Sequence, residues 1–106
     1  MEHRHDFRLD VSHCVTVVKN QCDLGCFDVT NIGYGGALVS PHSQSQSLAQ
    51  GDIVHVIGCI PDEHKVEKYE LNAMVVYVNS DGVGLTWIES EAHIYAALTH
   101  VVANAA

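Results

Sequence analysis

Residues 66–88 have the sequence VEKYELNAMVVYVNSDGVGLTWI, in which two runs rich in Val, Tyr and Leu flank the tetrapeptide Asn79-Ser80-Asp81-Gly82. β-Branched and aromatic residues favour strands. An Asp-Gly pair between two such runs is a strong local signal for a hairpin. The sequence therefore predicts a pair of antiparallel strands over residues 66–78 and 83–88.

Alternating apolar and polar residues predict further strands on the N-terminal side of this hairpin. Within residues 9–18, the apolar residues Leu9, Val11, Val15 and Val17 stand at odd-numbered positions. This period of two is typical of a half-buried strand. Strands are also predicted over residues 26–30, 37–39 and 53–60, with a turn over residues 19–25. Residues 40–51 are predicted to form a polar loop that contributes little to the hydrophobic core.

The period changes near the C-terminus. Ile94, Leu98, Val101 and Val102 follow helical spacing, and Ser90 is a suitable N-cap, so a helix is predicted over residues 90–103. Because closure removes exposed strand edges, the predicted fold is all-β: a small six-stranded antiparallel β-barrel with a C-terminal α-helix. The chain is expected to be one domain, with an arm at residues 1–8 and the barrel at residues 9–88.

The charge balance excludes several classes of partner. Lys and Arg number 5 against 13 Asp and Glu, giving a net charge of −8, which disfavours nucleic-acid polymers and anionic membranes. No apolar run is long enough for membrane insertion. The charged N-terminus has no secretory h-region, so a cytoplasmic protein with reduced thiols is expected, with Cys14 and Cys59 as small apolar strand residues.

Two short elements are candidates for binding an anionic ligand. Arg4 and Arg8, the two arginines of the chain, are four residues apart, and each guanidinium can contact phosphate or guanine through two parallel hydrogen bonds. Residues 31–36, Asn-Ile-Gly-Tyr-Gly-Gly, combine a side-chain amide with three glycines. Such a turn is expected to need positive φ or a close approach of another group to its backbone.

In this order, Arg4-His5-Asp6-Phe7-Arg8 and Asn31-Ile32-Gly33-Tyr34-Gly35-Gly36 resemble the Arg-x-x-x-Arg and Asp/Asn-x-Ser-x-x-Gly motifs of the PilZ family. The resemblance implies a six-stranded barrel followed by a helix, and cyclic di-GMP as the ligand. It also implies that Arg4 and Arg8 hold phosphate and guanine and that Asn31 contacts a guanine edge. Gly36 would let the backbone approach closely.

The sequence departs from the family pattern at one of these positions. Gly33 stands where the motif usually has Ser, so one hydroxyl contact is missing, and this should weaken binding by at most about tenfold. His3 precedes the first arginine, at a position that the resemblance associates with ligand stoichiometry.

The expected function is that of a cyclic di-GMP receptor that signals to an unidentified protein partner through an order change, without enzymatic activity, cofactor or metal. A ligand-independent adaptor of the same fold is the alternative, motivated by Gly33 and the acidic composition. A small metalloprotein is a third hypothesis, which the eight histidines and four cysteines suggest but their spacing does not support.

Overall fold

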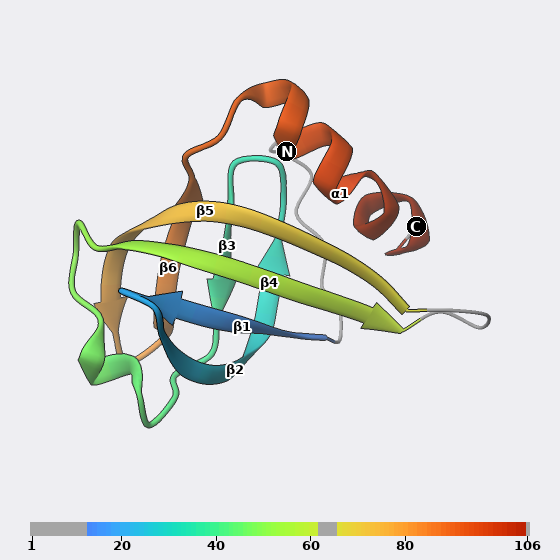
Figure 1. The fold of residues 1–106 in the computed structure, drawn as a ribbon. Helices are drawn as coiled ribbons and strands as arrows, with labels where there is room; N and C mark the ends of the chain where they lie inside the picture. The colour runs from blue at the N-terminus through green and yellow to red at the C-terminus, as the bar shows by residue number, and fades with distance from the viewer. Residues whose placement is uncertain (1–12, 62–65, 106) are drawn as a thin grey trace, which may run out of the picture.

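The computed structural model describes residues 13–61 and 66–105 of the chain (Figure 1). The predicted arm at residues 1–8 and the start of the predicted first strand lie outside these residues. The strands are β1 (Cys14–Lys19), β2 (Cys22–Ile32), β3 (Gly36–Val39), β4 (Ile53–Pro61), β5 (Val66–Asn79) and β6 (Gly82–Trp87); the helix is α1 (Glu91–Ala105), and a 3₁₀ turn, η1, spans Ser45–Ser47.

The six strands form a closed antiparallel barrel with the order β1-β2-β3-β6-β5-β4, in which β4 pairs again with β1. The hairpin predicted over residues 66–88 forms with two turn residues, Ser80 and Asp81, and Asn79 pairs with Gly82. The predicted fold class is therefore confirmed.

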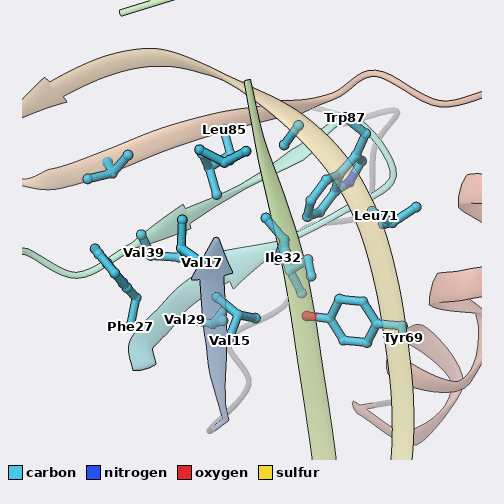
Figure 2. Close-up of a cluster of buried hydrophobic side chains, with 14 of the residues drawn as sticks. Val15, Val17, Phe27, Val29, Ile32, Val39, Tyr69, Leu71, Leu85 and Trp87 are labelled. Atoms are coloured by element: carbon cyan, nitrogen blue, oxygen red, sulfur yellow. The ribbon is translucent and has the colours of Figure 1, made fainter. Parts of the chain in front are cut away.

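The barrel interior is filled with apolar side chains from all six strands, and no polar or charged residue is fully buried in the part of the chain that the structure describes. Phe27 and Trp87 lie at opposite ends of the cluster drawn in Figure 2. Burial of this apolar area is the main stabilising contribution to the fold. The largest fully buried side chains are Phe27, Ile32, Leu71, Leu98, Val15, Val17, Val39, Val54, Val56, Val75 and Val83.

The turn between β1 and β2 is shorter than predicted. Asn20 and Gln21 have φ values of 52° and 66°, and two consecutive left-handed residues form the tight hairpin turn whose twist matches the flanking strands. Residues 22–25 consequently belong to β2, so the turn predicted over residues 19–25 was too long.

The polar loop over residues 40–51 is present, but the prediction that it adds little to the core was wrong. Leu48 is 5% exposed and belongs to the core cluster. His42 stacks on Phe27 with ring centroids 4.3 Å apart. Lys19 holds the loop from outside, with its ammonium 2.9 Å from the Ser47 carbonyl and 2.9 Å from Asp52. The loop therefore closes one end of the barrel.

The cysteines differ from expectation. Cys14 in β1 and Cys26 in β2 form a disulfide, so the prediction of reduced thiols was wrong for this pair. Cys59 is exposed rather than a core residue. The neighbouring strands bring the first two thiols together, a contact that their separation of twelve residues does not reveal.

Helix α1 begins after Ser90, whose hydroxyl accepts a hydrogen bond from the His93 amide at 3.1 Å, so the predicted cap is confirmed. The helix ends two residues later than predicted. It buries Ile94, Leu98 and Val101 against the barrel. In Figure 1, α1 lies on the same side of the barrel as the turn between β2 and β3.

Candidate functional site

A β-bulge sets the direction of Asn31 at the end of β2. Val29 pairs with Val39 and Asn31 pairs with Leu38, so Thr30 is an extra residue between the two pairs. Bulges redirect the following side chains. Because directly opposite residues point to the same face, Asn31 shares the outer face of the barrel with Leu38.

The Asn31 side chain has an unsatisfied atom. Its Oδ1 is buried and has no hydrogen-bond partner among the residues that the structure describes. A buried acceptor left unpaired costs about 1–3 kcal/mol, and most buried polar atoms in folded proteins are paired. This oxygen is therefore suited to accept a hydrogen bond from a donor that comes from outside the described residues.

The turn after Asn31 is held by hydrogen bonds to its main chain. The Gly33 amide donates to the Gly36 carbonyl at 2.9 Å. The Trp87 indole N–H donates to the Gly33 carbonyl at 2.9 Å from within the barrel. Thr86 donates its hydroxyl to the Gly35 carbonyl at 3.2 Å. The corner is thus fixed against β6.

Replacing Trp87 with Phe tests the contribution of the indole to this corner. The variant keeps most of the apolar contact but leaves the buried Gly33 carbonyl without its donor, which should cost about 1–3 kcal/mol of unfolding free energy. Urea denaturation followed by circular dichroism measures the loss. A change below about 0.5 kcal/mol would mean that water replaces the indole N–H as donor.

Gly36 allows close contact between β3 and β6. A Cβ atom built there would lie 1.9 Å from the Leu85 carbonyl oxygen, so the expected close approach is confirmed. Positive φ is not used in this turn: the described glycines with positive φ are Gly25, Gly51 and Gly82.

A groove of about 310 Å³ lies beside this corner, on the outer face of β3, β5 and β6. Tyr77, 41% exposed, packs its ring against Gly84, where a Cβ would lie 2.4 Å from the ring. Leu38 connects the groove to the corner because it pairs with both Asn31 and Gly84. None of the described residues that line the groove is charged; they are Gly35, Gly36, Ala37, Leu38, Val76, Tyr77, Gly84, Leu85 and Thr86.

The structure thus brings together three of the residues that the motif singled out: Asn31, Gly33 and Gly36. Arg4, Arg8 and His3 lie outside the described residues, so their roles stay predictions. Sequence reasoning missed Tyr77, which reaches the groove through a second bulge between Val75 and Tyr77.

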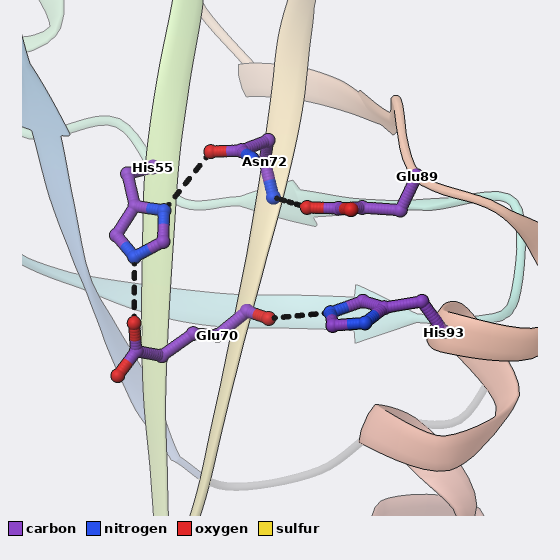
Figure 3. Close-up of polar contacts among 5 residues, drawn as sticks. All are labelled: His55, Glu70, Asn72, Glu89 and His93. Atoms are coloured by element: carbon purple, nitrogen blue, oxygen red, sulfur yellow. Dashed lines mark hydrogen bonds and ion pairs between the residues drawn. The ribbon is translucent and has the colours of Figure 1, made fainter.

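A polar cluster lies away from the groove, on the outer face of β4 and β5 near the start of α1 (Figure 3). His55 contacts Asn72 Oδ1 through Nδ1 at 3.0 Å and Glu70 Oε1 through Nε2 at 2.8 Å. Both ring nitrogens thus face acceptors, so the protonated ring fits this site best. The hydrogen bonds to Asn72 and Glu70 raise the pKa of His55 above its ordinary value.

Stability should depend on pH through His55. A raised pKa in the folded state means that the contact stabilises the fold below the unfolded pKa of about 6.5, and that this stabilisation is lost as pH rises through the higher folded pKa. His55→Gln should therefore be less stable than wild type at about pH 5.5, by less than about 1 kcal/mol because the pair is exposed, and nearly equal to it at about pH 8.5.

Chemical denaturation of both proteins at the two pH values isolates this contribution. The comparison must be between variants, since burial lowers the pKa of His13 and so acts in the opposite direction. A difference between wild type and His55→Gln that is the same at both pH values would contradict the assignment.

Within residues 13–61 and 66–105, no group of three or more His, Cys, Asp or Glu side chains is arranged to hold a metal ion. The helix in the described part of the chain is not long and apolar enough to cross a membrane.

No protein-family model matches the chain, and no curated protein matches it in sequence. Among solved structures, the chain is similar to the inhibitor of motility MotI/DgrA of Bacillus subtilis, with a TM-score of 0.75 and 20% sequence identity. The match covers 98% of this chain and 52% of that one, so the chain spans about half the length of the motility inhibitor. At this identity the likeness concerns the fold alone, and that fold is PilZ-like, a six-stranded antiparallel barrel followed by a helix.

Proposed function

We propose that the chain is a cytoplasmic receptor domain for cyclic di-GMP, which it binds at the corner between β2 and β3 and the adjoining groove. The observation that carries the proposal is the buried Oδ1 of Asn31, which has no partner within residues 13–61 and 66–105, beside a turn whose main chain is fixed by Trp87. The PilZ-like fold and the two sequence motifs support the same ligand.

The chemistry of guanine matches the corner. A guanine edge carries an exocyclic amino group, which can donate a hydrogen bond to Oδ1 of Asn31. Gly35, which is exposed, offers no side chain that would keep a base or phosphate away from the main chain. Tyr77 adds an exposed aromatic ring on the wall of the groove, and stacking of a base on an aromatic ring contributes about 1–3 kcal/mol.

The phosphates of the ligand need cations that the groove lacks. Its walls carry no charge, and the whole chain has a net charge of −8, so the long-range field repels an anion. In the proposal Arg4 and Arg8 supply this charge locally.

The corner is also connected to α1, which offers a route to a protein partner. Tyr34 stacks on Tyr95 with ring centroids 4.3 Å apart and planes 13° apart. Tyr95 is 58% exposed. In the proposal, a ligand at the corner changes the order of the N-terminal arm and the surface around this stack, and an unidentified protein recognises the change.

Isothermal titration calorimetry of the full chain with cyclic di-GMP tests the proposal. Wild type should bind saturably, and Arg4→Ala and Arg8→Ala should each weaken binding by about tenfold to a hundredfold, the effect of losing a charge-assisted hydrogen bond. Asn31→Ala should also weaken it. GTP and linear diguanylate are the comparison ligands.

Lys68→Ala is the matched control. Lys68 is exposed on β5, and its removal changes the net charge by one unit, as the arginine variants do. The affinity of Lys68→Ala for cyclic di-GMP should stay within about twofold of wild type if local contacts outweigh the long-range field. Unchanged affinity in both arginine variants would refute the proposed contacts of Arg4 and Arg8 with the ligand, and a flat trace with wild type would favour a ligand-independent adaptor.

A further inference from the structure

Three of the four cysteines gather on the outer face of the barrel, on the adjacent strands β2, β1 and β4. Val15 and Gly58 pair between β1 and β4 and are both buried. This is the last pair of the β1–β4 ladder, and Cys14 and Cys59 are the next residues along the two strands. Side chains alternate between faces along a strand, so both thiols lie on the outer face.

Cys26 lies on the other side of Cys14. It pairs with Thr16 in the register of β1 with β2, so it is the diagonal neighbour of Cys14 on the same face. The Cα atoms of Cys14 and Cys26 are 5.8 Å apart, and the two residues form a disulfide. Cys14 is thus flanked by its disulfide partner on one strand and by Cys59 on the other.

If the register of β1 with β4 continues by one residue, Cys14 and Cys59 lie opposite each other. Directly opposite residues of an antiparallel pair have Cβ atoms about 4.5–5.5 Å apart, and a disulfide needs about 3.5–4.5 Å. A small movement of the strands is enough to close this difference. Cys59 is an exposed free thiol, so it is accessible to reagents and to a neighbouring disulfide.

From this arrangement we infer that Cys14, Cys26 and Cys59 form a thiol–disulfide exchange site. The Cys59 thiolate attacks Sγ of Cys14, a bond forms between these sulfurs, and the Cys14–Cys26 bond breaks with its electron pair passing to Cys26. The number of disulfides and the oxidation state of the chain are unchanged, so the step needs no outside oxidant. The exchange moves the crosslink from β1–β2 to β1–β4 and frees Cys26, an exposed residue on β2.

Cys22 does not take part in this exchange. It is exposed and free, but it pairs with Lys19 at the other end of the hairpin. Four residues of extended chain separate it from Cys26, which is about 13 Å at 3.3 Å per residue. Cys22 therefore serves as the control thiol.

Alkylation of the full chain followed by peptide mapping tests the inference. The protein is first oxidised with glutathione disulfide, and the linkage is mapped without reduction. After a native incubation without alkylating agent, which leaves Cys59 free to attack, a brief pulse of iodoacetamide should label Cys26 in wild type, and the peptide map should contain a Cys14–Cys59 crosslinked peptide. Cys59→Ser should label Cys26 at least tenfold more slowly, whereas Cys22→Ser should behave as wild type.

Three results would overturn the inference: no Cys14–Cys26 linkage after oxidation, no label on Cys26 in wild type, or equal labelling of Cys26 in wild type and Cys59→Ser. A rate that rises with protein concentration would also refute it, because it would mean exchange between molecules. Circular dichroism verifies that the Ser variants, which change an exposed sulfur to oxygen, are folded. None of these results depends on nucleotide binding, so the exchange site and the proposed receptor function can fail separately.

Discussion

Gly36→Ala is expected to lower the free energy of unfolding by about 3 kcal/mol, at the upper end of the usual range for overpacked sites. The added Cβ would lie 1.9 Å from the Leu85 carbonyl oxygen. This oxygen belongs to the main chain of β6, so relief requires β3 or β6 to move. Because Gly36 pairs with Thr86 in the ladder between them, the movement weakens a barrel contact and displaces the corner next to Asn31.

Gly84→Ala is the matched control on the adjacent strand. Its added Cβ would lie 2.4 Å from the ring of Tyr77, and this half-exposed side chain can rotate away, so a loss of only about 1 kcal/mol is expected. For a domain of this size, 1 kcal/mol corresponds to about 4–8 °C in Tm. Thermal and urea unfolding of both variants measure the difference, and equal losses would show that the β3–β6 contact yields as easily as a side chain.

The sequence predicted the strands well where local signals are strong. The hairpin over residues 66–88 has both alternation and an Asp-Gly turn, and it forms almost as predicted. The turn between β1 and β2 has no such glycine: Asn20 and Gln21 take positive φ because the flanking strands pair. That pairing is a tertiary effect, and residue type alone does not reveal it.

Bulges explain why the candidate site was predicted only in part. Asn31, Gly33 and Gly36 are close in sequence, so a short motif was enough to identify them. The bulge at Thr30 determines the face to which Asn31 points, and the bulge at Val76 brings Tyr77 over Gly84. A period-two pattern assumes regular pairing, and therefore it cannot predict either displacement.

The sequence also did not predict contacts between segments that are distant along the chain. The Cys14–Cys26 disulfide depends on strand register, and the burial of Leu48 depends on how the polar loop folds back over the barrel end. The loop contains mainly Ser and Gln, so its composition predicted exposure. Leu48 and His42 nevertheless join the loop to the core, and Lys19 holds it from outside.

The second large effect is expected from Phe27→Ala, which tests this closed end of the barrel. Phe27 is fully buried in β2, and truncation of a buried Phe to Ala typically costs about 3–5 kcal/mol through lost transfer free energy and the cavity that remains. The cost should be near the top of this range, because the variant also removes the ring on which His42 stacks and so loosens the loop over residues 40–51.

Two further variants separate these contributions. Phe27→Leu keeps most of the volume and should cost less than about 1.5 kcal/mol, while His42→Ala removes only the stacked ring and should cost about 0.5–1.5 kcal/mol. Amide hydrogen exchange should show faster exchange at Leu48 in His42→Ala than in wild type, with the strands unaffected. If His42→Ala were as destabilising as Phe27→Ala, the loop rather than the cavity would determine the stability of this end, and a polar segment would be the principal closure of the barrel.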